Sequence, residues 1–498
     1  MAKNIIQLDL EASTEFQNIF KSDVMGRYVR PARTPHYIFD TTILLNVGTA
    51  VYAFSIENQN TTEVMHYVIY TTGILRIYDE QFILQFTTSI SAESAAGFPQ
   101  AAIGSFTHAV VNNQLIINSE YLSAPIYGVV GGGVIPAVKV ASINPDTSAI
   151  DLLPGGVASF GDRIVYSYIN QIFISDPGTE PRTIVAENTI SFGGKVLDMF
   201  QAGPNGLFYV FTTAGLYTLP ADGLAGQQSY AGFITSSKDY EATQLHNVAY
   251  SKNAIFGLLD NGVWDVNNSK NIELIKWRRG RGLSQTVGNF TDFRYGRIYT
   301  YENGFICQIG TTILMIDIVN KYSSWINNTN DSTTQLVGVL KTRDGKNIFC
   351  ATDAVWELIG NSGNLSGVDV DYNNAAFFGT CATNILTPPA ASPVIREITV
   401  GLDNNGKQVQ TYVRGTTSAN TTGNTIIGAN ATNVFGSEPL WDTAGLVYSE
   451  AKFRSTRNRM AVRGDNLDFE MKVTGANARI SSDVQIVLLG QGTDRPSI

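Results

Sequence analysis

The stretch Gly215-Leu216-Tyr217-Thr218-Leu219-Pro220 is a short run of alternating side chains after a turn, and similar runs recur through the first three quarters of the chain. The copies lie roughly 42 to 50 residues apart, which is the length of one four-stranded blade of a β-propeller. The spacing therefore predicts a repeat in which each copy marks one blade. The clearest copies are residues 171–176, 215–220, 262–266, 312–317 and 354–359.

A second strand-like segment precedes several of these copies. Residues 161–168, 206–211 and 253–259 are each rich in aliphatic and aromatic side chains, and a turn joins each of them to the copy that follows. Asp260-Asn261-Gly262 is one such turn, of the kind that closes hairpins. The repeat thus predicts pairs of antiparallel strands.

The number of repeats sets the predicted number of blades. With weaker copies near Ile74 and Leu115, about seven units fit the chain. Six is the alternative, because residues 125–154 are irregular. The sequence predicts an all-β protein, a β-propeller of about six or seven blades with an additional C-terminal β domain.

Composition agrees with an all-β fold. Of the 498 residues, 44% are hydrophobic, only 15% are charged and 46 are glycine. Thr, Ser and Asn therefore occupy outward strand positions where Lys and Glu are more usual. The chain is long enough for two or three domains, or for a propeller with an appendage.

The N-terminal segment, residues 1–36, is predicted to be an arm with a short helix. Phe16, Ile19 and Phe20 would share one face of a helix over residues 12–25. We expect this helix to be almost the only one in the protein.

Three further segments follow the arm. Residues 37–381 are predicted to form the propeller body, and the proline-rich residues 382–393 a linker or crossing loop. Residues 394–498 are predicted to form the C-terminal β domain, in which residues 395–402 would pair with residues 409–413.

Net charge and cysteine content exclude some classes of function and some kinds of site. A net charge of −9 argues against a protein that grips nucleic acid over its whole surface, because phosphate neutralisation needs clustered Lys and Arg. Cys307, Cys350 and Cys381 are odd in number and have no CxxC spacing, so neither a disulfide framework nor a zinc site is expected. We expect the cysteines to be buried free thiols.

Motifs for catalysis are weak. The four histidines lie in no metal-ligand spacing, and no GxSxG nucleophile elbow occurs. Residues 401–408 approach a phosphate-binding loop, but Gln408 stands where Ser or Thr would hold magnesium. We expect no enzyme, no cofactor and no metal site, although carboxylates from different blades could still meet.

The N-terminus carries no apolar signal core before Asp9 and Glu11, so synthesis in the cytoplasm is expected. The longest uncharged run, residues 121–138, is interrupted by Pro125 and Pro136. It is therefore read as a β-hairpin or long loop and not as a spanning helix.

Two basic patches could contact neighbouring subunits, DNA or only solvent. The first, residues 276–281, sets a tryptophan among cations and could meet phosphate or an acidic neighbouring surface. The second has the spacing of one strand and its turn on a domain rim. The candidate contacts are Arg278, Arg279, Arg281, Arg454, Arg457 and Arg459, with Arg463 continuing the second patch.

The end of the chain carries a resemblance to a known family. Residues 453–464 are rich in arginine, and residues 467–475 and 484–490 follow as two alternating strands. This ending resembles the close of the packaged-DNA stabilisation or tail-nozzle proteins of short-tailed bacteriophages. The resemblance extends in organisation to most of the chain.

The resemblance implies a structural virion protein of a phage tail, made in the host bacterial cytoplasm. It implies a ring, typically of six copies, that retains the packaged genome and opens for DNA ejection. Its partners would be tail adaptor or portal-proximal proteins, tail fibres, double-stranded DNA in the lumen and the host cell surface. The uncharged, glycine-rich loop at Gly131, Gly132 and Gly133 is the candidate gate.

Two alternatives stay open. One is a tail adaptor or hub without gating. The other is a carbohydrate-binding or carbohydrate-cleaving tail propeller, which would carry aromatic and carboxylate residues on one face of its blades.

Overall fold

A computed structural model gives the fold of the chain. It describes residues 3–9, 15–17, 19–21, 28–31, 34–37, 47–58, 61–90, 97–122, 125–130, 138–139, 155–175, 184–203, 206–219, 232–235, 245–259, 262–265, 270–271, 296–301, 304–309, 312–318, 322–326, 335–345, 347–352, 355–359, 378–385, 394–403, 409–416, 426–427, 454–463, 466–474 and 479–489. Within these ranges nearly every regular element is a strand, and the one helical element is the short 3₁₀ turn η2 (Gln100–Ala102).

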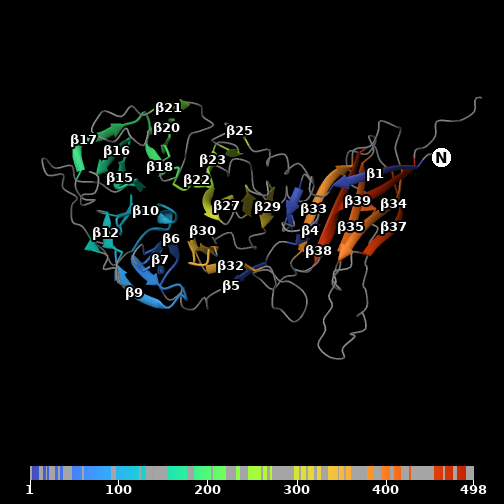
Figure 1. Cartoon of the computed structure of the whole chain (residues 1–498), viewed down its shortest axis with the longest axis horizontal. Helices are drawn as coiled ribbons and strands as arrows, with labels where there is room; N and C mark the ends of the chain where they lie inside the picture. The colour runs from blue at the N-terminus through green and yellow to red at the C-terminus, as the bar shows by residue number, and fades with distance from the viewer. Residues whose placement is uncertain are drawn as a thin grey trace, which may run out of the picture.

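Seven four-stranded antiparallel units surround one centre (Figure 1), so the protein is an all-β propeller with seven blades. Blade 1 contains β6 (Ala50–Glu57), β7 (Val64–Tyr70), β8 (Ile74–Tyr78) and β9 (Leu84–Ser89). Blade 2 contains β10 (Phe106–Val111), β11 (Gln114–Ser119), β12 (Ile126–Val129) and β13 (Val138–Lys139). Blade 3 contains β14 (Val157–Phe160), β15 (Arg163–Tyr168), β16 (Gln171–Ser175) and β17 (Ile184–Ser191).

The remaining four blades repeat this order from an inner to an outer strand. Blade 4 contains β18 (Val196–Gln201), β19 (Phe208–Thr212), β20 (Gly215–Leu219) and β21 (Gly232–Thr235). Blade 5 contains β22 (Val248–Ser251), β23 (Ala254–Leu259), β24 (Gly262–Asp265) and β25 (Lys270–Asn271). Blade 6 contains β26 (Arg297–Tyr301), β27 (Gly304–Ile309), β28 (Thr312–Asp317) and β29 (Tyr322–Ile326). Blade 7 contains β30 (Leu336–Lys341), β31 (Asn347–Ala351), β32 (Val355–Ile359) and β5 (Thr34–Tyr37).

The sequence repeat is the third strand of a blade. Its clear copies coincide with β16, β20, β24, β28 and β32, and the weaker copy near Ile74 coincides with β8. The copy near Leu115 lies instead on β11, the second strand of blade 2. The irregular interval after it holds the hairpin of β12 and β13, in which Tyr127 pairs with Val138, so seven blades form and not six.

The ring closes through the N-terminal segment. Strand β5 pairs with β32, with Tyr37 opposite Trp356, and supplies the outer strand of blade 7. The predicted boundary at residue 37 is therefore wrong, because residues 34–37 already belong to the propeller. On the inner side, β30 meets β6 in a parallel bridge between Gly338 and Ala53.

The helix predicted over residues 12–25 is also wrong. Strands β2 (Glu15–Gln17) and β3 (Ile19–Lys21) lie there instead. Phe16 of β2 pairs with Cys381, and Gln17 bridges to Trp325 of blade 6. Tertiary pairing with two sheet edges outweighs the weak local preference for a helix.

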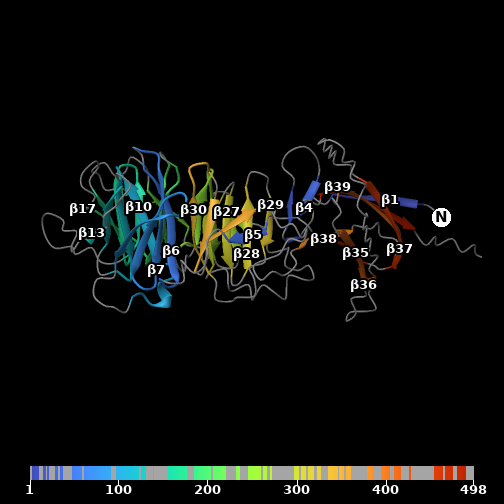
Figure 2. The same cartoon turned by 90° about the horizontal axis from the view of Figure 1, so that it is seen from below.

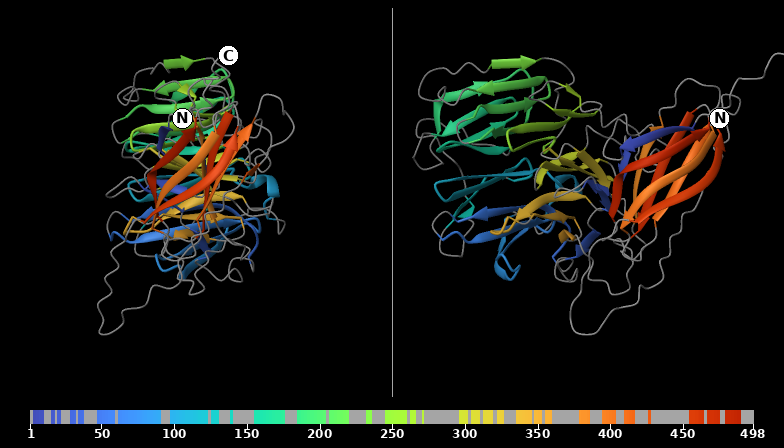
Figure 3. Two further views of the ribbon diagram at one scale, coloured as in Figure 1. Left: turned by 90° about the vertical axis from the view of Figure 1, so that its right-hand side faces the viewer. Right: turned by 45° about the vertical axis from the view of Figure 1, so that its right-hand side comes forward.

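The C-terminal domain consists of two sheets. The first orders β3, β4 (Tyr28–Pro31), β39 (Arg479–Leu489), β34 (Val394–Asp403) and β37 (Arg454–Arg463), and β1 (Lys3–Asp9) also pairs with β39. The second continues blade 6 through β2 into β33 (Phe378–Ile385), β38 (Asn466–Thr474), β35 (Val409–Thr416) and β36 (Ile426–Ile427). Figures 2 and 3 show these strands as a second lobe beside the propeller.

Two expectations about this domain need correction. Strand β33 runs to Ile385, so the domain begins before residue 381 and the predicted linker starts too early. Strands β34 and β35 do not pair with each other, because they lie in different sheets. Each of these long strands pairs on both sides within its own sheet, which leaves no free edge for the other.

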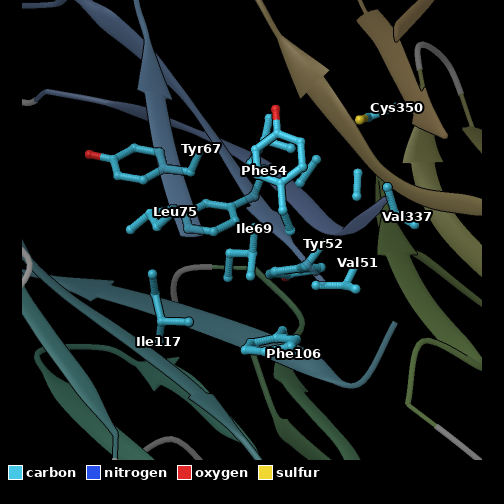
Figure 4. Close-up of a cluster of buried hydrophobic side chains, with 14 of the residues drawn as sticks. Val51, Tyr52, Phe54, Tyr67, Ile69, Leu75, Phe106, Ile117, Val337 and Cys350 are labelled. Atoms are coloured by element: carbon cyan, nitrogen blue, oxygen red, sulfur yellow. The ribbon is translucent and has the colours of Figure 1, made fainter. Parts of the chain in front are cut away.

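Hydrophobic clusters between neighbouring blades form the core. The largest joins blades 7, 1 and 2, and Figure 4 shows Val51, Phe106 and Val337 converging within it from β6, β10 and β30. Further clusters join each successive pair of blades around the ring. Full burial of one such side chain contributes roughly 1.5–3 kcal/mol, so the blades stabilise one another.

Candidate functional site

Polar and aromatic side chains meet at the axis of the propeller. The third residue of the inner strand is Tyr52 in β6, His108 in β10, Asp198 in β18 and Tyr299 in β26. His246 joins them from the residues just before β22. These five residues are called the axial cluster.

Ring contacts within the axial cluster link distant blades. The Tyr52 and His246 rings stack with centroids 5.4 Å apart, although they belong to blades 1 and 5. His246 also lies 5.0 Å from the Tyr299 ring of blade 6. Side chains from blades on different sides can meet in this way only near the axis.

Hydrogen bonds cross the axis as well. His246 Nε2 lies 2.9 Å from the Phe106 carbonyl oxygen of blade 2, so this nitrogen carries the proton and donates it. Tyr52 Oη lies 2.8 Å from His108 Nδ1. Both histidines therefore have defined partners at one ring nitrogen.

Arg297, two residues before Tyr299, lies across the same region. Its Nη2 donates to the Ile103 carbonyl at 2.6 Å, and its Nη1 donates to Gln335 Oε1 at 3.0 Å. The guanidinium rests over Gly104, where a Cβ atom would lie 2.4 Å from Nε. Blade 6 is thereby tied to blade 7 and to the start of blade 2.

Local irregularities in two inner strands help to orient the side chains of two residues of the axial cluster. The pairing register shifts between Ala50 and Tyr52 in β6, and between Val196 and Asp198 in β18. A β-bulge at such a point turns the following side chain relative to a regular strand. Tyr52 and Asp198 follow directly after these shifts.

Burial dominates the electrostatics of the axial cluster. It raises the pKa of Asp198 to about 7, against the opposing effect of the Met199, Val248 and His246 backbone N–H groups. Asp198 Oδ1 accepts a 3.0 Å hydrogen bond from the Met199 N–H, whereas Oδ2 is buried without a partner. Burial also lowers the pKa of His108 to about 3 and that of His246 to about 4.

His108, His246 and Tyr299 are only half-buried, so these side chains keep some accessible surface. The Tyr299 hydroxyl is fully buried and has no hydrogen-bond partner.

The chemistry open to this cluster is limited. No group of three His, Cys, Asp or Glu side chains in the described ranges could hold a metal ion. Glycoside hydrolysis needs two carboxyl groups, and among the residues just described Asp198 is the single carboxyl group of the axial cluster. The arrangement can exchange a proton at Asp198 and can hold blades together.

The residues predicted from sequence are different from those of the axial cluster. Gly131, Gly132 and Gly133 lie outside the described residues, in the connection between β12 and β13, and Arg278, Arg279 and Arg281 lie outside them between β25 and β26. Arg454, Arg457, Arg459 and Arg463 belong to β37, the last strand of its sheet.

The backbone of β37 pairs with that of β34. Arg457 lies opposite Thr399, Arg459 opposite Glu397, Arg463 opposite Val394 and Arg454 opposite Leu402.

Two other predictions concern thiols and membrane spans. Cys307 and Cys350 are buried free thiols, as expected, and burial raises the pKa of the Cys307 thiol. Cys381 lies on β33. In the part of the chain that the structure describes, no helix has the length and apolar character needed to cross a membrane.

Comparisons with known proteins add little to this picture. No protein-family model matches the chain, and no curated protein sequence matches it. Among solved structures, YCF48 from Cyanidioschyzon merolae is similar with a TM-score of 0.39 and 11% identity, over 65% of this chain and 97% of that one. BamB from Moraxella catarrhalis is similar with a TM-score of 0.37 and 10% identity, over 72% and 98%.

Proposed function

We propose that the chain is a structural virion protein of a phage tail, one subunit of a nozzle ring that closes the DNA channel, retains the genome and opens for ejection. The observation that carries the proposal is the arginine-bearing edge strand β37, followed by the two long strands β38 and β39. This is the segment on which the resemblance to tail-nozzle proteins rests.

The contacts across the propeller axis limit where DNA could pass. Arg297, His246 and Tyr52 reach across the centre of the propeller through contacts between distant blades. A passage for duplex DNA would therefore lie between copies of the chain and not within one propeller. Copies related by rotation repeat one heterologous interface and close into a ring around such a passage.

The connection between the two lobes suits a subunit that carries load. Strand β2 joins blade 6 to β33 in one continuous sheet, while β1 pairs with β39 along seven residue positions. The same N-terminal segment then closes blade 7 through β5. Because one segment pairs with both lobes, force on the C-terminal domain is passed to the propeller through backbone hydrogen bonds.

Charge is consistent with a lumen through which DNA slides. A net charge of −9 leaves few phosphate neutralisations, so counterion release would give little affinity for DNA. The arginines of β37 are then assigned to contacts between subunits, with local DNA contact as the alternative. Gly131, Gly132 and Gly133 remain the proposed gate, and their connection follows the third strand of blade 2.

Imaging of the purified full chain by negative-stain electron microscopy tests the ring. We expect six-fold particles with a central hole, alone or after addition of the tail adaptor protein. A chain that stays monomeric under both conditions would contradict the proposal.

Experiments on assembled particles distinguish a gating nozzle from an adaptor or hub without gating. Deletion of Gly131–Gly133 should leave rings intact but alter genome retention or ejection. Unchanged retention and ejection would exclude this loop as the gate. Binding of glycans by the isolated chain would instead favour a carbohydrate-binding propeller.

A further inference from the structure

We propose that Asp198 is a proton-binding site at the propeller axis, whose ionisation loosens the seam between blades 4 and 5. The inference stands independently of the proposed ring, because every group in it belongs to one propeller. It assigns a role to a buried carboxyl group that the tail function does not use.

The geometry around Asp198 distinguishes its two carboxyl oxygens. Oδ1 accepts the Met199 N–H at 3.0 Å, within its own strand β18. The carboxylate is also stabilised by the His246 and Val248 backbone N–H groups of blade 5. Oδ2 is buried and has no hydrogen-bond partner. An ionised carboxylate here carries charge on an unsatisfied oxygen, whereas a protonated one does not.

This carboxyl group lies at a seam that depends on side chains. At five of the seven seams the inner strands lie side by side, as β10–β14, β14–β18, β22–β26, β26–β30 and β30–β6, whereas β18 and β22 of blades 4 and 5, like β6 and β10 of blades 1 and 2, approach each other less closely. Between blades 4 and 5 the link is the cluster of Phe211, Leu216, Val248 and Ile255, together with the Asp198 environment. Water that enters to solvate an ionised Oδ2 would do so at this seam.

The other titratable groups at the axis keep their charge near neutral pH. Tyr52 from β6 and Tyr299 from β26 both have a raised pKa and stay protonated. His108 from β10 and His246 before β22 have a pKa of about 3 and about 4, so both stay neutral. Burial lowers the pKa of the Arg297 guanidinium, but arginine stays cationic in proteins. Asp198, with a pKa of about 7, is the group among these six that changes charge there.

Loosening of the seam reaches the rest of the axis through His246. Its backbone N–H faces Asp198, while its side chain binds the Phe106 carbonyl and stacks on Tyr52. Displacement of this residue therefore weakens contacts to blades 1 and 2 as well. The proton on Asp198 acts as a clamp on the axial cluster.

Hydrogen exchange on the full chain, at pH 6 to 8 and corrected for intrinsic amide rates, tests the inference. Peptides that cover β18 and β22 should lose protection as pH rises, by up to about tenfold per pH unit above 7. Asp198→Asn, which is neutral at every pH, should abolish this dependence. Asp162→Asn, at an exposed turn between β14 and β15, is the matched control and should behave like the wild type.

Equal pH dependence in the wild type and Asp198→Asn would overturn the proposal. If the variant does not fold, infrared spectroscopy of the wild type decides instead. The carbonyl band of a protonated carboxyl group should disappear between pH 6 and pH 8, and a spectrum without such a band at pH 6 would overturn the proposal. Tyr299→Phe, which leaves the carboxyl group in place, should retain the band.

Discussion

At the scale of single residues, buried titratable groups make stability depend on pH in two opposing ways. Burial lowers the pKa of His66 to about 4, as it lowers those of His108 and His246. Unfolded histidine titrates near 6.5, so the stabilisation from these neutral rings is present above about pH 6.5 and lost as pH falls through 4. Asp198 behaves oppositely: its contribution is complete below about pH 3.9 and lost as pH rises through about 7.

We therefore expect the melting temperature to pass through a maximum as pH varies. It falls at lower pH because the histidines lose their stabilising effect, most steeply between pH 6 and pH 4, and it falls toward about pH 7 because Asp198 loses its own. Differential scanning calorimetry across pH 4 to 9 measures it. Asp198→Asn should raise the melting temperature at pH 8 relative to the wild type, because the buried charge is gone, and should do so less at pH 5. A melting temperature independent of pH from 4.5 to 7 would contradict the role of the histidines.

Position 338 requires glycine because the backbone of a neighbouring strand approaches it closely. A Cβ atom at this position would lie 1.9 Å from the Ala53 carbonyl oxygen, across the bridge that joins blade 7 to blade 1. Gly338→Ala should cost about 1–3 kcal/mol by overpacking and lower the melting temperature. Gly161→Ala, where no atom lies within 4 Å but φ is +59°, is the control and should cost about 1 kcal/mol. Equal losses in the two variants would refute the close approach.

At the scale of elements, the N-terminal strands act as staples. Removal of residues 1–37 takes the outer strand from blade 7, the partner β1 from β39 and the bridge β2 from between β29 and β33. We expect the truncated chain to melt at lower temperature and to be cleaved faster by protease in both lobes, because each exposes unpaired strand edges. Limited proteolysis with mass spectrometry measures both, and truncation of residues 495–498 is the control.

The accuracy of the predictions from sequence also differs between elements. The third strands of six of the seven blades were predicted at their correct positions, because alternation and turns are local signals, whereas the copy near Leu115 fell on the second strand of blade 2. The helix over residues 12–25 was wrong, since Phe16 and Gln17 find partners hundreds of residues away. No local pattern reports such pairing.

The axial cluster can be recognised in the sequence only when the equivalent strands of successive blades are aligned. Tyr52, His108, Asp198 and Tyr299 occupy the same position of the inner strand, but they are chemically different residues. A search for one repeated residue type therefore misses them. Once the strand bounds are known, the shared position is the signal.

At the scale of the whole molecule, the edge strand β37 is expected to take part in assembly. Combined Arg457→Ala and Arg459→Ala should reduce the fraction of chains in rings, because both residues lie on the last strand of the sheet. Light scattering or mass photometry measures the ring fraction. Lys252→Ala, at an exposed turn of blade 5, removes a cation without affecting this strand and serves as control.

A second outcome would reassign these arginines. If ring formation stays intact while affinity for duplex DNA falls and becomes less dependent on salt, these residues contact phosphate instead. If neither property changes, the arginines are ordinary solvated surface.

Local sequence patterns specify the class of fold, the repeat length and the third strand of most blades. These follow from side-chain alternation and turn residues, which act over a few neighbouring positions. The tertiary structure alone decided that seven blades close through β5, that the N-terminal segment is shared by both lobes, and that Asp198 meets Tyr52 and Tyr299 at one axis. Those results depend on pairing and burial between residues far apart in the chain, for which local sequence carries no pattern.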